Sequence, residues 1–474
     1  MSRPSNPFKD PEQTGAGHQA PGMNRPFSWL TRPRPAELVI QGKPMLDLKY
    51  VIANTETVRQ NCRNRNVPDD VLEDIDRVVA LEAERKGLLS VVEEIRRRQN
   101  EVAQATGREK DPERRAALIE EGKRLKAVAG AQEDQLRVMD DEIKQRLRRV
   151  PNLTHPDAPV GVTEDDSREL RRVGTPRTFE FPVKDHVELG KSLDLIDFET
   201  GGKVAGTGFY FLKNDAVLLE LALQQYAVRT LAAAGFTPII TPDLARNSIL
   251  EGIGFTPRGV ETQVYSIEES DLSLVGTAEI TLGGMLADEL LEESQLPIRY
   301  VGLSHCFRTE AGAAGRASRG LYRVHQFTKV EMFAFTTPET SGAIHAELLA
   351  IEEQIFQALG VPYRVLDICT GDLGGPAYRK FDLEAWMPGR GAAGEYGEVT
   401  STSDCTDYQS RRLNIRYRPG GQKGTRFVHT LNGTAVALSR ALIVILENYQ
   451  RADGRIDVPE VLRPYLGKDV LGNP

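Results

Sequence analysis

Residues 304–333 contain the side chains whose types and spacing point most directly to chemistry. This stretch includes Phe307-Arg308-Thr309-Glu310 and ends with Tyr322-Arg323-Val324-His325-Gln326-Phe327 and Glu331. Arginine carries a rigid fork of N–H donors that fits the oxygens of a phosphate or a carboxylate. A carboxylate at the other end of the stretch suits an amine or a hydroxyl. We therefore predict a site that holds a nucleotide and an amino acid side by side.

The elements that position these residues follow from the apolar runs on either side of a basic, glycine-rich segment. Both runs are strand-like, which predicts a long antiparallel hairpin across residues 304–333. Cross-strand pairing in a hairpin fixes its side chains, so cations and carboxylates would be held in place on one surface.

Three further segments carry carboxylates, hydroxyls, amides or cations that could contact a substrate. Thr277 and Glu279 stand two residues apart in Gly276-Thr277-Ala278-Glu279, and on a strand such residues face the same side. Glu398-Val399-Thr400-Ser401 combines a carboxylate with hydroxyls. The third, Leu431-Asn432-Gly433-Thr434-Ala435 followed by Ser439-Arg440, predicts a strand that leads into a long apolar helix.

Taken together and in this order, the segments resemble the motifs of class II aminoacyl-tRNA synthetases, and most closely those of the bacterial seryl-tRNA synthetase family. An amphipathic helix predicted over residues 214–235 and the following Phe236-Thr237-Pro238-Ile239-Ile240-Thr241-Pro242 are similar to motif 1. Residues 304–333 resemble motif 2 and residues 431–440 resemble motif 3. Each short pattern is weak alone, but the joint match over about residues 45–470 is specific.

The resemblance implies a role for each matching residue. The catalytic residues would be Arg308 and Arg440. Serine would be bound by Thr277, Ala278, Glu279, Arg308, Glu331, Asn432 and Thr434. ATP would be bound by Arg308, Thr309, Glu310, Val324, Phe327, Glu398, Val399, Thr400, Ser401 and Arg440. Magnesium, which prefers hard oxygen ligands, would be held by Glu398 and Ser401. We interpret His325 as structural rather than as a general base.

A different pattern occupies residues 69–150. Leu81, Leu88, Ile95 and Val102 recur at seven-residue steps, and after a break at Gly107–Pro112 a second apolar seam runs from Leu118 to Val150. This spacing predicts an antiparallel coiled-coil hairpin. Cations gather toward its tip: Arg96, Arg97, Arg98, Arg108, Lys110, Arg114, Arg115, Lys123, Arg124 and Lys126. For an arbitrary protein a plain spacer or dimerisation coil is the better interpretation, but a basic-tipped rod also suits an RNA backbone. The family carries such an arm, which grips tRNA(Ser).

Composition limits the class of protein. With 474 residues, 40% hydrophobic and 27% charged, the chain is expected to be globular and large enough for two or three domains. A net charge of −8 argues against a protein that coats nucleic acid, although a local basic patch would suffice for binding RNA. The four cysteines are widely spaced, which predicts free thiols rather than zinc ligands or disulfides. No apolar run is long enough to span a membrane.

We therefore expect an α+β protein in which a two-helix coiled coil precedes an antiparallel sheet flanked by helices. The expected domains are a disordered extension at 1–44, a tRNA-binding domain at 45–155 and a class II catalytic domain at 156–474. We expect either that Met45 is the true start or that the extension is a dispensable tail, with a transit peptide as the remaining alternative.

The expected function is serine–tRNA ligase activity with ATP and Mg²⁺, in a cytoplasmic homodimer that makes no membrane contact. The acceptor would be tRNA(Ser), with tRNA(Sec) as a second acceptor by analogy. The alternatives are a synthetase-like homologue that is non-catalytic and one that charges a different acceptor.

Overall fold

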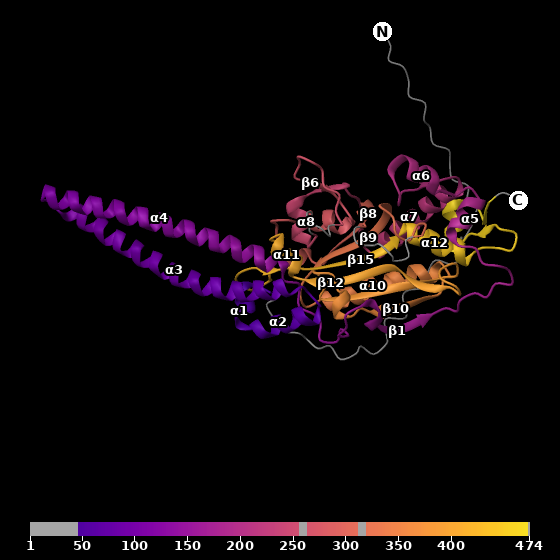
Figure 1. Ribbon diagram of the computed structural model, residues 1–474, viewed down its shortest axis with the longest axis horizontal. Helices are drawn as coiled ribbons and strands as arrows, with labels where there is room; N and C mark the ends of the chain where they lie inside the picture. Colours follow the sequence, from indigo (N-terminus) through magenta and orange to yellow (C-terminus); the bar gives the residue numbers. More distant parts are fainter. Residues whose placement is uncertain (1–45, 256–262, 311–318, 473–474) are drawn as a thin grey trace, which may run out of the picture. The chain divides into compact units, whose positions relative to one another are not determined.

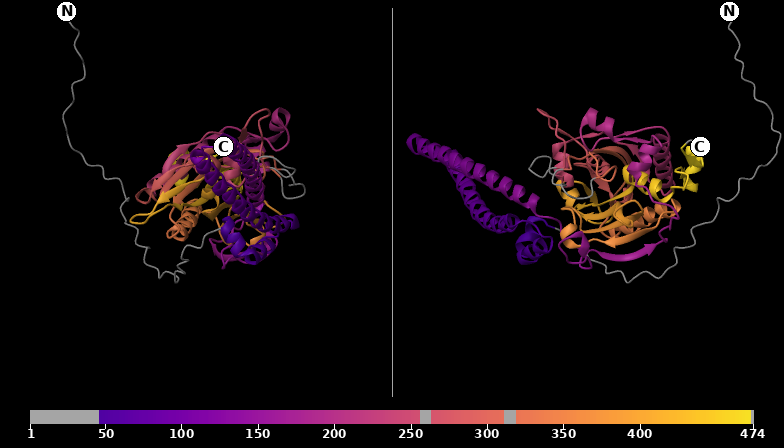
Figure 2. Two further views of the ribbon diagram at one scale, coloured as in Figure 1. Left: turned by 90° about the vertical axis from the view of Figure 1, so that its left-hand side faces the viewer. Right: turned by 45° about the vertical axis from the view of Figure 1, so that its right-hand side comes forward.

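The computed structural model describes residues 46–255, 263–310 and 319–472. The predicted extension at 1–44 and the centre of the 304–333 hairpin lie outside these ranges. The described part begins with two short helices, α1 (Leu48–Ala53) and α2 (Thr55–Asn64), and continues into two long ones, α3 (Asp69–Arg108) and α4 (Pro112–Arg149). The two long helices lie side by side in every view (Figures 1 and 2). The predicted antiparallel coiled coil is therefore confirmed.

The break between the long helices has a local cause. Asp111 caps α4 by accepting a hydrogen bond from the backbone N–H of Arg114 at 2.9 Å, and Pro112 occupies the first turn, where its missing N–H costs nothing. The seam predicted from the heptads is buried or half-buried along both helices, with Leu81, Val102 and Ala129 among its most buried residues.

The remainder is built on an eight-stranded sheet with the order β1-β10-β11-β12-β15-β9-β8-β4. All neighbours pair antiparallel except β4 and β8, which run parallel. The bounds of the strands are β1 Arg168–Val173, β4 Thr237–Ile240, β8 Ile298–Phe307, β9 Gln326–Thr336, β10 Tyr363–Asp367, β11 Arg379–Met387, β12 Glu395–Thr406 and β15 His429–Ala437. The α+β class with a mainly antiparallel sheet is confirmed.

Helices cover both faces of this sheet. On one face α7 (Asp215–Ala233), α10 (Ser341–Ala358) and α12 (Leu438–Asn448) pack on Met332, Leu431 and their neighbours in a large apolar core. On the other face α8 (Asn247–Ile253) and α9 (Ala278–Gly284) pack against Phe333 and Phe335 in a second core. Because successive strand residues alternate in direction, Phe327, Lys329 and Glu331 of β9 share this second face.

The base of the long helices is joined to the sheet by a buried polar contact. The guanidinium of Arg65 is 5% exposed and donates to the carbonyl oxygens of Asn152, Ala377, Leu373 and Gly374. The side-chain amide of Asn152 donates to further carbonyl oxygens in the sheet part of the chain. These hydrogen bonds provide partners for polar groups that would be costly to bury unpaired. They also hold the base of the long helices against the sheet.

Shorter elements complete the described residues. The helices are α5 His186–Ser192, α6 Phe198–Ala205, α11 Tyr408–Arg412 and α13 Arg463–Leu466. The strands are β2 Ile196–Asp197, β3 Phe211–Leu212, β5 Leu244–Arg246, β6 Leu272–Leu274, β7 Leu290–Glu292, β13 Arg416–Arg418, β14 Arg426–Phe427, β16 Ile456–Asp457 and β17 Val470–Leu471. All four cysteines are free and buried. Across the described ranges, no helix has the length and apolarity needed to cross a membrane.

Candidate functional site

A pocket lies on the sheet face that carries Lys329 and Glu331, with about 500 Å³ of empty space that includes open solvent at its mouth. It is lined by residues of β9, β12, β15 and α12 and by the residues that follow β8 and precede β9. The lining residues are Arg308, Glu310, Tyr322, Arg323, Val324, Phe327, Lys329, Glu398, Val399, Thr400, Thr434, Ala437, Ser439 and Arg440. Four of these are cations and two are carboxylates, so the pocket suits an anionic ligand with a planar part against Phe327.

Arg308 is held at the end of β8 by backbone and side-chain contacts. Its N–H donates to the carbonyl oxygen of His325 at 2.9 Å, and its Nε donates to that of Gly276 at 3.3 Å. The guanidinium lies over the ring of Phe327, 5.4 Å from the centroid. The hairpin register, which pairs Phe307 with Gln326, brings these groups together.

His325 itself is enclosed by neighbours. Its ring stacks on Phe209 at 5.2 Å between centroids, and Nδ1 lies 2.9 Å from the carbonyl oxygen of Arg308. These contacts are those of a residue that supports the hairpin, which agrees with our structural interpretation.

Arg440 of α12 also lines the pocket. Its Nη1 lies 3.2 Å from Glu398 Oε1 and donates to the Glu398 carbonyl oxygen at 2.9 Å. Its guanidinium also lies over the ring of Tyr322, 4.6 Å from the centroid. Although burial opposes ionisation, the nearby cations Arg440, Lys380 and Arg308 hold the pKa of Glu398 below its usual value.

Beside the pocket lies a cluster of a lysine, a glutamate and a threonine. Lys329 Nζ is 2.5 Å from Glu331 Oε2, and the hydroxyl of Thr434 donates to the same oxygen at 3.2 Å. Glu331 and Thr434 face each other in the pairing of β9 with β15. Since Lys329 and Thr434 also line the pocket, the cluster and the pocket form one continuous site.

Glu279 lies deeper in the same site and has no ion-pair partner among the described residues. Its Oε1 accepts from Gln409 Nε2 at 2.7 Å and from Asn432 Nδ2 at 2.9 Å. The orientation of the Gln409 amide is set by Thr430, whose hydroxyl donates to Gln409 Oε1 at 2.7 Å. Burial, with a smaller contribution from the charge of Glu331, raises the pKa of Glu279 to about 7.

The expectation that Thr277 and Glu279 lie on a strand is wrong. Helix α9 begins at Ala278, and the side chain of Thr277 is its N-cap, accepting from the Glu279 N–H at 3.3 Å. Threonine followed by a glutamate in the first turn is a typical helix start, so the local sequence carried this signal. Both side chains are nevertheless buried, and Glu279 reaches the site from the helix.

The segment Glu398–Ser401 is divided between the two faces of the sheet. Ser401 pairs with Asp382 across β11 and β12, and the Ser401 hydroxyl is hydrogen-bonded to that carboxylate. The Thr400 hydroxyl instead donates to Glu352 of α10 at 3.0 Å, on the opposite face. Asp382 Oδ1 is buried and lacks a hydrogen-bond partner among the described residues. The described residues contain no group of three His, Cys, Asp or Glu side chains that could bind a metal unaided.

The structure thus gathers most of the residues that the sequence singled out. Arg308, Glu310, Val324, Phe327, Glu398, Val399, Thr400, Thr434 and Arg440 line the pocket, and Glu279, Glu331 and Asn432 are hydrogen-bonded beside it. Thr277, Ala278, Thr309 and Ser401 do not line it. The sequence analysis assigned no role to Lys329 or Gln409. Alternation along β9 could have identified Lys329, which stands two residues before Glu331.

Comparison with known proteins places this geometry in context. Residues 45–154 match a model of the seryl-tRNA synthetase N-terminal domain, and residues 263–449 match the class II tRNA synthetase core domain (G, H, P, S and T). The chain is 56% identical over 428 residues to a serine–tRNA ligase of Rubrobacter xylanophilus, covering 90% of this chain and 99% of the relative. It is 58% identical over 431 residues to that of Rhodopirellula baltica, with the same coverage.

Solved structures of seryl-tRNA synthetases have a similar fold. Seryl-tRNA synthetase from Pyrococcus horikoshii complexed with ATP aligns with a TM-score of 0.85 and 39% identity, covering 91% of this chain and 100% of that one. The cytoplasmic serine–tRNA ligase of Naegleria fowleri in complex with AMP aligns with a TM-score of 0.80 and 33% identity, covering 90% and 99%.

Proposed function

The chain belongs to the seryl-tRNA synthetase family, and on that premise we propose that it is a serine–tRNA ligase. It would activate L-serine with ATP and transfer the seryl group to the 3′ end of tRNA(Ser). One observation carries this proposal: a cation-lined pocket adjoins a buried cluster of carboxylates and a hydroxyl on one sheet face, with Lys329 and Thr434 common to both.

In the first step the serine carboxylate attacks the α-phosphorus of ATP, and pyrophosphate leaves with the electrons of the broken P–O bond. Arg308 is assigned to the α-phosphate and the serine carboxylate, and Arg440 to the γ-phosphate, because guanidinium groups stabilise charge that builds on phosphate oxygens. Phe327 would stack on adenine, with Glu310, Thr309 and Val324 beside it. In the second step a ribose hydroxyl of the tRNA attacks the acyl carbon and AMP leaves.

Serine would be recognised by Glu331, Glu279, Asn432 and Thr434, with Thr277 and Ala278 at the start of α9. Both donors to Glu279 converge on Oε1, which leaves Oε2 for the substrate. A site whose polar groups would be left unpaired rejects alanine strongly, by ~10⁴-fold or more. Threonine is excluded by the size of the pocket, which is a weaker filter.

Magnesium would be held by Glu398 and Ser401 together with ATP phosphates and water. The fit is supported by their hard oxygens and by the neighbouring Asp382, whose Oδ1 has no hydrogen-bond partner among the described residues. When bound, the ion would neutralise charge on the phosphates. Val399 and Thr400 would line the phosphates through the β12 backbone.

We assign residues 45–155 to tRNA binding and residues 156–474 to catalysis. Near the tip of the coiled coil, six cations form no ion pair with a described residue: Arg108, Lys110, Arg114, Arg115, Arg124 and Lys126. Unpaired cations are available to phosphates, whereas Arg96, Arg97 and Arg98 are paired with glutamates.

The chain would act as a homodimer. Apolar side chains of α7 and β4 are exposed, with Val217 at 39%, Leu218 at 43%, Leu221 at 54% and Ile240 at 83%. Such a patch is typical of an interface. Light scattering on the purified protein tests this, and a monomer at micromolar concentration would contradict it. A cytoplasmic location is supported by the four free thiols.

Amino-acid-dependent ATP–pyrophosphate exchange without tRNA is the decisive experiment. Serine should drive exchange, while threonine, alanine and glycine should not. Charging of tRNA(Ser) and tRNA(Sec) transcripts then identifies the acceptors. Deletion of residues 85–136 should abolish charging and leave exchange intact. Absence of exchange with every amino acid, in folded protein with Mg²⁺, would favour the non-catalytic alternative. Exchange without tRNA charging would favour a different acceptor.

A further inference from the structure

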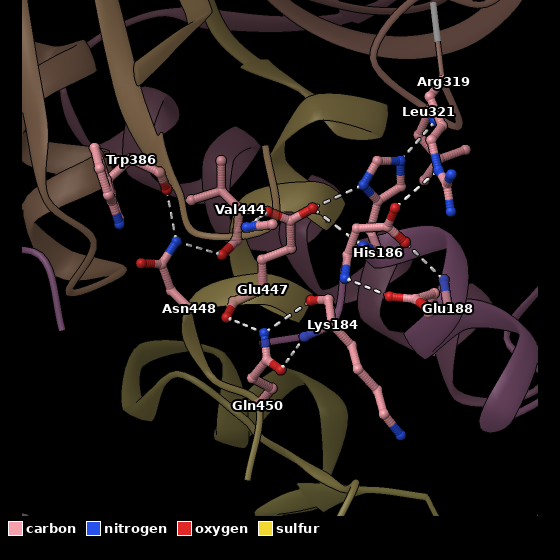
Figure 3. A network of polar contacts seen from close by, with 12 residues as sticks. Lys184, His186, Glu188, Arg319, Leu321, Trp386, Val444, Glu447, Asn448 and Gln450 are labelled. Atoms are coloured by element: carbon pink, nitrogen blue, oxygen red, sulfur yellow. Dashed lines mark hydrogen bonds and ion pairs between the residues drawn. The ribbon is translucent and has the colours of Figure 1, made fainter. Parts of the chain in front are cut away.

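A buried histidine–glutamate pair lies outside the site described above and has no part in the proposed chemistry. His186 begins α5 and is 6% exposed, and Glu447, near the end of α12, is 1% exposed. His186 Nδ1 lies 2.8 Å from Glu447 Oε1, which also accepts from the His186 backbone N–H at 3.1 Å. Figure 3 shows the pair at the centre of a hydrogen-bonded network.

The pair fixes two backbone N–H groups from distant segments. The N–H of Leu321, at the return of the hairpin, donates to His186 Nε2 at 3.0 Å. The N–H of Gly389, in the turn after β11, donates to Glu447 Oε2 at 2.8 Å. Because a backbone N–H can only donate, Nε2 must be the acceptor, and the proton on Nδ1 must be directed at Glu447. Both ring nitrogens of His186 therefore take part in a hydrogen bond.

Glycines allow this close approach. A Cβ added to Gly320, whose φ is +68°, would lie 2.0 Å from His186 Nε2. A Cβ added to Gly389 would lie 2.6 Å from the Cα of Asp185 and 3.0 Å from Cδ of Glu447. Neither position tolerates a side chain without displacing the pair.

The residues that follow the two fixed N–H groups contact each other beside the pocket, which Tyr322 lines. Arg390, after Gly389, lies over the ring of Tyr322, after Leu321, at 4.1 Å from the centroid. Arg440 lies over the same ring at 4.6 Å, and its Nε donates to the Tyr322 carbonyl oxygen at 3.4 Å. Arg440 and Glu447 are both on α12, so one side of this arrangement is a rigid helix.

We propose that His186 and Glu447 are positioning residues that hold the Arg390–Tyr322–Arg440 stack at the phosphate end of the pocket. The proposal rests on the proposed function, since it assigns the stack to the ATP phosphates. It predicts that a defect in the pair weakens ATP binding and leaves the serine pocket, built from β9, β15 and α9, unaffected.

Two substitutions test the two hydrogen bonds of the His186 ring one at a time. His186→Asn places an amide N–H near the position of Nδ1 and retains the bond to Glu447, but loses the acceptor for Leu321. His186→Gln extends one bond further and can accept from Leu321 instead. We expect His186→Asn to raise the KM for ATP about tenfold in pyrophosphate exchange while changing the KM for serine less than twofold. His186→Gln should lie closer to the wild type.

His345→Asn is the matched control. His345 of α10 is also buried, at 4% exposed, and its Nε2 is hydrogen-bonded to the Thr402 carbonyl oxygen at 3.1 Å, on the sheet face away from the pocket. It should lower the melting temperature without separating the two KM values. A double-mutant cycle of His186→Asn with Tyr322→Leu adds a second criterion, because residues that act through one another are not additive.

Equal increases in both KM values, or additive effects in the cycle, would overturn the proposal. The affinity for ATP measured by calorimetry, in the absence of serine, keeps the test independent of exchange. If the wild type shows no serine-dependent exchange, the proposed function fails. An unchanged ATP affinity in His186→Asn overturns the positioning role in either case.

Discussion

Glu279 and Glu398 face the same site, yet the protein moves their pKa values in opposite directions. Glu279 is 9% exposed and contacts only amide donors, so burial dominates and its pKa rises to about 7. The side chain of Glu398 is 44% exposed and lies 3.2 Å from the guanidinium of Arg440, so its pKa is lowered despite the opposing effect of burial.

The difference shows how the two halves of the site are specialised. On the nucleotide side, cations lie against the carboxylate of Glu398. They keep that carboxylate ionised and are themselves held in place for phosphate binding. On the serine side, Glu279 lies among neutral amides, where a hydroxyl or an amine of the substrate becomes its strongest partner. Four substitutions test this contrast, in order of decreasing effect.

Replacing Arg440 by alanine should break the nucleotide side most severely. The variant loses the group that stabilises phosphate charge and pairs with Glu398. We expect pyrophosphate exchange to fall by about 10³-fold, with little change in the KM for serine. Arg440→Lys is the control and should recover only part of the rate, since an ammonium cannot reproduce the guanidinium fork. If the rate of pyrophosphate exchange falls by less than tenfold in Arg440→Ala, the role assigned to the nucleotide side is wrong.

Glu331→Gln should disable the serine side. It leaves the buried Lys329 without a carboxylate partner, which costs about 3–5 kcal/mol of stability, and serine-dependent exchange should fall by about 10²-fold. Thermal unfolding and exchange measure the two effects separately. The double variant Lys329→Met/Glu331→Gln removes both charges and should regain stability without regaining activity. Recovery of activity in that variant would show that Glu331 serves stability only.

Glu279→Gln should reveal the energetic cost of the raised pKa. The folded state favours protonated Glu279, so wild-type stability is lost as the pH rises from 4.5 toward 7, and the full penalty applies above that range. The difference between a pKa of 4.5 and one of about 7 corresponds to about 3 kcal/mol in the free energy of unfolding. The variant should therefore melt above the wild type at pH 8, and the gap should close as the pH falls to 5. A gap that does not depend on pH would refute this account, and serine activation should be weaker in the variant at pH 8.

Gln409→Met should have the smallest effect. It removes the shorter of the two hydrogen bonds to Glu279 while preserving volume, so the KM for serine should rise about tenfold, equivalent to about 1.4 kcal/mol. The KM for ATP serves as the internal control. An equal rise in both constants would mean that Gln409 supports the whole sheet rather than the serine side.

Much of the fold could be predicted from the sequence because its signals are local. Heptad spacing predicted the two long helices α3 and α4, with a break between them at Gly107–Pro112. Paired apolar runs predicted the β8–β9 hairpin, and residues 431–440 predicted a strand that leads into α12. The strand assigned to Thr277–Glu279 failed because a periodicity of two residues cannot be distinguished from a capped helix start over so short a segment.

The sequence by itself determined which chemical groups the site contains, since residue types and their order along the chain carry that information. Only the tertiary structure decided how those groups act. Lys329 reaches Glu331 and Thr434 through strand register, and Gln409 reaches Glu279 across 130 residues. Whether a glutamate is ionised depends on its neighbours in space, as Glu279 and Glu398 show, and no local pattern encodes them.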